Sequence, residues 1–191
     1  MKRTLTTLTC LLLAATASTA QAAVVNAANV GVFTTFQDTN TGRIWLDMNN
    51  FFNQTTTSMV ASASVAGFTF ATKSDVQALL SSLPLGSGDW ATYKSIMGDA
   101  PNRELIWGAY DDGDSDPTRV GWAYAYDFNT DWPFADSSTD MNSVPNGGWS
   151  DADMNIWAYQ TGTISVPEPG SLALMGLGLA GLAALRRRKY A

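Results

Sequence analysis

Fourteen consecutive residues, 172–185, carry neither a charge nor a hydrogen-bonding side chain. A helix that is apolar on every face is not a surface helix of a soluble domain, because it has no polar side to turn to water. As a helix the run is about 21 Å long at ~1.5 Å per residue, against roughly 30 Å of bilayer hydrocarbon. The cations Arg186, Arg187, Arg188 and Lys189 follow directly, and such a cluster holds its end of a membrane helix in the cytoplasm. We therefore expect a short transmembrane helix over 171–185 with a basic stop at 186–189. A packed helix with a solvated basic tip is the alternative.

The residues ahead of the apolar run are Val166, Pro167, Glu168 and Pro169. Each proline fixes its own φ at about −65° and withholds an N–H donor, and it drives the residue before it into extended geometry. An extended segment just outside a membrane is one that a processing enzyme can thread. This tetrapeptide, the apolar run and the basic cluster, in that order over residues 166–191, resemble a PEP-CTERM sorting signal. The resemblance implies an exported bacterial protein, anchored for a time in the inner membrane and cut near 166–169 by an exosortase, a membrane transpeptidase-like enzyme.

The beginning of the chain predicts export independently. Lys2 and Arg3 precede a mainly apolar stretch over 5–17, and Ala20-Gln21-Ala22 forms a small-residue cleavage site. This order is typical of a secretory signal peptide, which signal peptidase would cut after Ala22. A retained membrane helix is the alternative. Lipidation of Cys10 is another, although the residue before it is Thr rather than the small residue of a lipoprotein signal.

Between the two targeting segments, residues 23–165 form one domain long enough to bury a core. This stretch holds five Lys and Arg against sixteen Asp and Glu, which gives a net charge of −11. Such an acidic surface repels phosphate groups, so nucleic acid is not expected as a partner. Solubility outside the cell explains the charge most simply, and cation binding is the sharper alternative.

The apolar patterns predict an α+β fold: a small mixed domain of antiparallel strands with two or three short helices. The clearest helix follows Thr72, where Asp75 completes a capping box and Val76, Leu79, Leu80 and Leu83 repeat with helical spacing. Shorter helices are expected over 58–65 and 90–97. Strands are expected over 30–38, 43–47, 68–70, 105–110, 119–128 and 155–164. Residues 49–57 and the polar stretch 129–153 are expected to be loops.

Five segments of the domain are similar to Lcl C-terminal-type domains, which belong with the C-type-lectin-like folds. They are 41–47 (TGRIWLD), 67–72 (GFTFAT), 105–108 (LIWG), 123–128 (AYAYDF) and 157–159 (WAY). The resemblance implies a mixed α+β fold and an extracellular binding or adhesion module.

Residue content excludes most catalytic chemistry. The chain has no histidine, and its one cysteine lies in the signal peptide. Triads that use His or Cys and zinc sites built from these ligands are therefore impossible in the exported domain. Paired carboxylates are the remaining option, and no motif supports them. We expect a protein that is not an enzyme.

Two sets of residues are candidates for binding. Asp112, Asp114 and Asp116 have the spacing of the first three ligands of an EF-hand loop, but Pro117 stands where that loop has Gly and Ala123 where it has Glu. They could still bind calcium through carboxylates and backbone carbonyls, with help from Asp151 or Asp153, and a solvated turn is the alternative.

Trp132 and Trp149 lie in the polar stretch 129–153 and could stack on sugar rings. The sequence thus supports two compatible hypotheses. The first is a non-enzymatic, exosortase-processed component of the cell surface, or of an extracellular polysaccharide matrix such as a biofilm. The second is a calcium-dependent, lectin-like module that binds carbohydrate.

Overall fold

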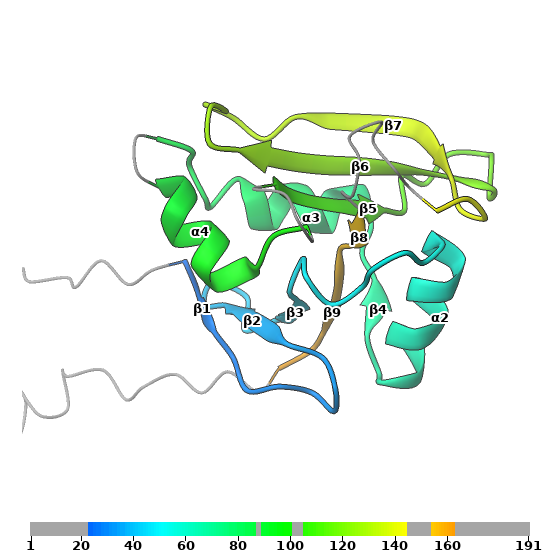
Figure 1. The fold of residues 1–191 in the computed structure, drawn as a ribbon. Coiled ribbons are helices and arrows are strands. Elements are labelled where there is room, and N and C mark those ends of the chain that lie inside the picture. The colour runs from blue at the N-terminus through cyan, green and yellow to red at the C-terminus, as the bar shows by residue number, and fades with distance from the viewer. Residues whose placement is uncertain (1–22, 87–88, 101–104, 145–153, 163–191) are drawn as a thin grey trace, which may run out of the picture.

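A computed structural model describes residues 23–86, 89–100, 105–144 and 154–162. Two sheets and three helices make up these residues, as the predicted α+β class requires. Figure 1 shows one sheet above the other, with α4 at the left of the view, α3 near its middle and α2 at the right.

The first sheet has the strand order β1-β2-β3-β9-β4, and all its strands are antiparallel to their neighbours. Its strands are β1 (Val24–Asn26), β2 (Thr35–Asp38), β3 (Ile44–Leu46), β4 (Thr69–Phe70) and β9 (Ala158–Gln160). The last strand of the described chain therefore lies inside this sheet, between β3 and β4, rather than at its edge.

The second sheet has the order β7-β6-β5-β8. It comprises β5 (Leu105–Tyr110), β6 (Arg119–Tyr126), β7 (Phe134–Asp140) and β8 (Asn155–Ile156). Strands β5, β6 and β7 form an antiparallel meander, whereas β8 runs parallel to β5. On β6 the small residues Ala123 and Ala125 face the core, so the large residues Trp122, Tyr124 and Tyr126 lie on the more exposed face.

The helices begin and end where local sequence signals place them. In α3 (Lys73–Leu80) the hydroxyl of Thr72 and the carboxylate of Asp75 form the predicted capping box. Helix α2 (Thr56–Val65) is capped by Thr55 and is followed by Gly67 at φ 87°, a conformation that favours glycine. Helix α4 (Asp89–Met97) is followed by Gly98 at φ 71°.

Two groups of buried side chains form the core. One is built around Phe36, Trp45, Trp157 and the apolar side of α3, and the other around Phe51, Met59 and Trp107 under α2. Residues 155–160 contribute to both groups through Ile156, Trp157 and Ala158, each fully buried.

The structure corrects three predicted elements. The strand expected over 30–38 is confined to β2, and Val30 and Phe33 form only an isolated bridge. Residues 134–140, expected to be loop, form strand β7. The single closing strand expected over 155–164 is divided into β8 and β9, which belong to different sheets.

Candidate functional site: the segment that leads into the sorting signal

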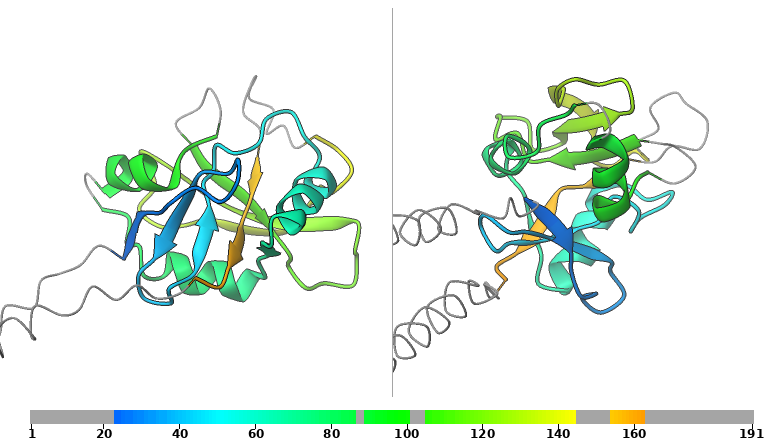
Figure 2. Two further views of the ribbon diagram at one scale, coloured as in Figure 1. Left: turned by 90° about the horizontal axis from the view of Figure 1, so that it is seen from below. Right: turned by 90° about the vertical axis from the view of Figure 1, so that its left-hand side faces the viewer.

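Residues 155–160 join the two sheets immediately before the predicted sorting signal. In β8, Asn155 and Ile156 pair with Gly108 and Ala109 of β5, and β9 then enters the first sheet. Trp157 stands at the junction, where its N–H donates to Ala109 O (2.8 Å) and its carbonyl accepts from Ala71 N (2.9 Å). Figures 1 and 2 show this segment crossing from one sheet to the other.

Side chains around this segment leave it little freedom to shift. The buried amide of Asn155 accepts from Phe51 N (2.9 Å) and donates to Phe51 O (3.4 Å), which ties the 49–55 loop to β8. The Trp157 indole lies against Gly108, where a Cβ atom would come within 2.8 Å of Nε1. Only a glycine at position 108 therefore leaves room for the Trp157 indole.

The first and last described residues both contact the turn between β2 and β3. Thr39 N donates to Ala23 O (2.9 Å), and Gly162 lies so close to Gly42 that an added Cβ would be 2.3 Å from the Gly42 carbonyl oxygen. The turn itself is held by Asp38, whose carboxylate accepts from Asn40 N and Thr41 Oγ1. The chain therefore enters and leaves the described domain at one place.

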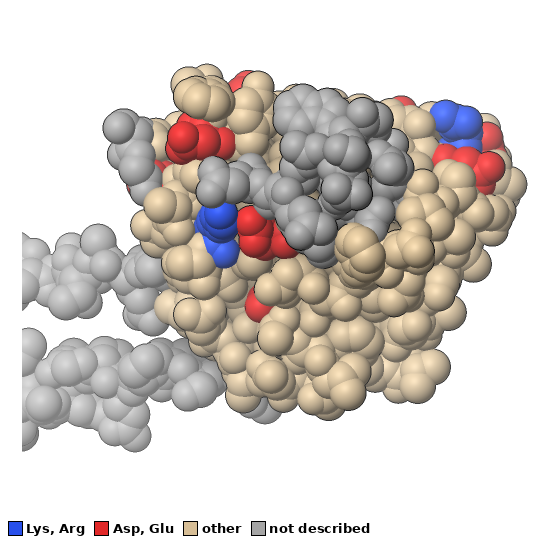
Figure 3. Space-filling model, in the orientation of Figure 1, with Lys and Arg blue, Asp and Glu red and all other residues tan. Residues whose placement is uncertain are grey.

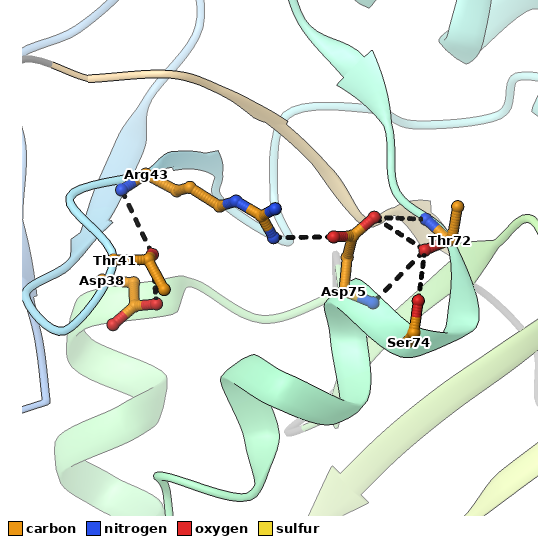
Figure 4. A network of polar contacts seen from close by, with 6 residues as sticks. All are labelled: Asp38, Thr41, Arg43, Thr72, Ser74 and Asp75. Atoms are coloured by element: carbon orange, nitrogen blue, oxygen red, sulfur yellow. Dashed lines mark hydrogen bonds and ion pairs between the residues drawn. The ribbon is translucent and has the colours of Figure 1, made fainter.

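Arg43 secures β9 at this place, as Figure 4 shows in part. Its guanidinium carbon lies 4.0 Å from the centre of the Tyr159 ring, and its Nη1 donates to Asp75 Oδ1 at 2.8 Å. Burial alone would raise the pKa of the Asp75 carboxyl, but hydrogen bonds from Thr72 and the charge of Arg43 lower it below its usual value. One side chain thus connects β3, β9 and the start of α3.

The predicted sorting residues begin just beyond this arrangement. Val166, Pro167, Glu168 and Pro169, the apolar run 171–185 and the basic cluster 186–189 lie outside the described residues, as does the predicted signal peptide 1–22. None of the helices in the described ranges is long and apolar enough to cross a membrane.

The carboxylates of the acidic loop after β5 form hydrogen bonds with neighbouring residues. The predicted calcium site stays a prediction, because Asp151 and Asp153, which could help to form it, lie outside the described residues. Asp112 Oδ2 accepts from Ser137 N (2.5 Å), the Asp114 carboxylate accepts from Ser137 Oγ, and Asp116 accepts from Thr118. In the part of the chain that the structure describes, no three Asp, Glu, His or Cys side chains gather in a way that could hold a metal ion. Asp112 and Asp114 thus fasten the loop to Ser137 of β7, which has φ 47°, and Asp116 bonds to Thr118 just before β6.

Trp132 is partly buried and contacts two neighbouring elements, and its predicted role in stacking on sugar rings stays a prediction. Its indole Nε1 donates to Leu83 O (2.8 Å), and its ring packs against Tyr93 with the ring centres 6.4 Å apart. Its partner in the sugar-stacking hypothesis, Trp149, lies outside the described residues.

Asp47 is a functional candidate that the sequence did not single out. Burial raises the pKa of its carboxyl to about 6, against a smaller opposing effect of Thr34, and Oδ1 is buried without a hydrogen-bond partner. Among the described residues, no charged neighbour is a cause of this shift. The burial comes from contacts distant in sequence, which no local pattern could reveal.

Comparison with known proteins identifies the segment that follows β9. Residues 165–189 match the family model of the PEP-CTERM protein-sorting motif. No curated protein and no solved structure matches the chain, so the resemblance to C-type-lectin-like domains is not supported. The predicted sorting signal is confirmed: the chain carries a PEP-CTERM protein-sorting motif three residues after the last residue of its described α+β domain.

Proposed function

We propose that this protein is exported, anchored for a time by its C-terminal segment and processed by an exosortase, and that its α+β domain then serves outside the cell as a non-enzymatic component of an extracellular polysaccharide matrix. The observation that carries this proposal is the match to the sorting motif at residues 165–189. The matrix role is inferred from the acidic, cysteine-free domain that this motif accompanies.

The position of β9 explains how the domain and its processing are related. The first sheet is complete only when residues 158–160 have joined it, because β9 separates β3 from β4. Four residues lead from Gly162 to Val166, and at most ~3.6 Å per residue they span about 14 Å. The enzyme therefore acts close beside the folded domain.

A role without catalysis agrees with the side chains available. The chain has no histidine and no cysteine after residue 10, so the nucleophiles and general bases that depend on these two residue types are missing. Burial rather than a neighbouring charge raises the pKa of Asp47 in the described structure. Binding is the function that these residues can perform.

The test replaces Pro167, Glu168 and Pro169 together by alanine in the full chain. We expect the variant to accumulate in the membrane fraction at full precursor length, because the extended segment that the enzyme recognises is lost. Fractionation followed by an immunoblot measures this. Thr161→Ala, an exposed substitution in the same connection, is the matched control and is expected to be processed normally.

Two outcomes would contradict the proposal. Equal processing of the triple-alanine variant would mean that the motif does not direct cleavage. Recovery of the processed wild-type protein entirely free in the medium, with none sedimenting with extracellular polymer, would remove the matrix role while leaving sorting intact.

A further inference from the structure

The charge of the domain is unevenly distributed along the chain and over its surface. Residues 24–37 and 48–72 contain no Asp, Glu, Lys or Arg, although the domain as a whole has a net charge of −11. Figure 3 shows the charged side chains over the upper part of the view and none at the lower right, over α2 and the β1–β2 connection. One side of an acidic protein is therefore uncharged.

This side also exposes apolar groups. Val65 at the end of α2 is 93% exposed and Val32 in the β1–β2 connection is 89% exposed. The two segments are neighbours, because the Phe33 ring lies 6.0 Å from the ring of Phe68, which follows α2, and 5.6 Å from that of Phe51. We call the exposed side chains here the charge-free face: Val32, Ser58, Ala61, Ser62, Ser64 and Val65.

Helix α2 has two different sides. Thr56, Met59 and Ala63 are buried in the domain, while Ser58, Ala61, Ser62 and Val65 repeat with helical spacing on the exposed side. These exposed side chains are small, so another helix could approach at the ~8–10 Å typical of packed helices. Surface helices ordinarily turn charged residues to water, and α2 has none.

We propose that the charge-free face binds a second copy of this chain, with the same face used by both partners. Two copies of a domain with a charge of −11 repel each other wherever their acidic surfaces meet. At the charge-free face they bring no like charges together, and the centres of protein interfaces are depleted of charge in the same way. A two-fold arrangement matches a surface to itself and closes without forming a filament.

The size of the face sets the strength of this association. The ten residues of α2 extend about 15 Å at ~1.5 Å per residue, so the helix and the adjoining connection cover only a few hundred Å2 per copy. This lies near the roughly 1,000 Å2 total that separates specific from incidental contacts. We therefore expect a reversible dimer in the micromolar-to-millimolar range.

Helix α2 lies away from both ends of the described domain. Ala23 and Gly162 both adjoin the β2–β3 turn, and α2 lies at the far side of the domain from the start of β1 and the end of β9 in Figures 1 and 2. We therefore expect association in the anchored and the processed protein alike. Only the recovery of material for the test rests on the export in the proposed function.

The test is sedimentation equilibrium of the protein recovered from the outside of cells that express the full chain. Val65→Lys places two like charges near each other across the interface, and we expect it to weaken the association constant at least tenfold. The fold should tolerate this change, since Val65 is almost fully exposed and a cation suits the last turn of a helix. Val32→Lys tests the same face from the β1–β2 connection.

Ala78→Lys on the exposed side of α3 is the matched control. It changes the net charge by the same amount as Val65→Lys, so a general electrostatic effect would strengthen association in both variants. Only a contact at the charge-free face predicts that Val65→Lys weakens the association while Ala78→Lys strengthens it. Added salt should also strengthen the wild-type dimer, because it screens the repulsion between the acidic surfaces.

Two results would overturn the proposal. One is a monomer at every concentration up to the millimolar range. The other is a dimer that both face variants leave unchanged, which would place the contact elsewhere, including in the C-terminal segment.

Discussion

At the scale of single residues, the fold partly buries the carboxyl group of Asp47, where its charged form is disfavoured. The Asp47 carboxyl has a normal value of 3.8 and a pKa of about 6 in the folded domain, chiefly because burial disfavours its charge. Between these two values the folded chain holds a proton that the unfolded chain has lost. The free energy of unfolding therefore falls as the pH rises from about 4 to about 6.

Asp47→Asn should remove this penalty. The full shift corresponds to about 3 kcal/mol at ~1.36 kcal/mol per unit, and partial solvent screening reduces our expectation to about 1–2 kcal/mol of added stability at pH 7. Urea unfolding at pH 7 and pH 4 measures the gain, which should vanish at the lower pH. Asp127→Asn, at an exposed position, is the control, and an equal gain in both variants would contradict the explanation.

Gly162 is the last described residue, and it lies against the turn between β2 and β3. A Cβ atom there would lie 2.3 Å from the Gly42 carbonyl oxygen and 2.9 Å from Ile44 Cγ1, and a backbone oxygen can move away only by distorting the turn. Gly162→Ala should therefore lower stability by about 1–3 kcal/mol. Thermal unfolding beside the neighbouring Thr161→Ala variant checks this, and equal melting temperatures would mean that the contact at Gly42 is not needed.

At the scale of elements, local signals predicted those structures that local contacts stabilise. Helix α3 follows from its capping box and apolar spacing, and strand β5 occupies the predicted range 105–110. Strand β7 was missed because its sequence, FADSSTD, contains mainly polar residues. It is an edge strand held by pairing with β6, and such pairing leaves no apolar alternation when neither face of the strand is deeply buried.

The division of residues 155–164 into β8 and β9 also could not be predicted from the sequence. The pattern of residues predicts extended structure but not its partners, and here the partner changes from β5 to β3 and β4 at Trp157. This change of partner is decided by contacts more than forty positions away in the sequence. A local pattern can therefore predict that the residues are extended, but it cannot predict which sheet they join.

Truncation of the chain at two positions separates the contribution of residues 155–160 to thermal stability from that of the sorting signal. A chain that stops after Gly162 should keep the thermal stability of the processed protein, since every described contact of the domain is retained. A chain that stops after Asp153 loses β8, β9 and the buried Trp157 and should show no cooperative unfolding transition. Circular dichroism during heating measures both, and cooperative melting of the shorter chain would contradict the role given to 155–160.

At the scale of the whole molecule, the sequence located the sorting signal but not the surfaces of the domain. The order of prolines, apolar run and cations is local, and the match at 165–189 confirms it. The roles of Asp112, Asp114 and Trp132 depend instead on Ser137 and Leu83, which approach only after folding. These contacts could not be predicted from the sequence, and the binding of calcium or sugar by these residues stays a prediction.

The intact mass of the protein recovered from outside the cell tests the central claim most directly. We predict a species that begins after Ala22, retains the domain through Gly162 and lacks the basic cluster Arg186 to Lys189. A recovered protein that still carries those four cations would contradict the account, because the segment after β9 would then not be a signal that is cut.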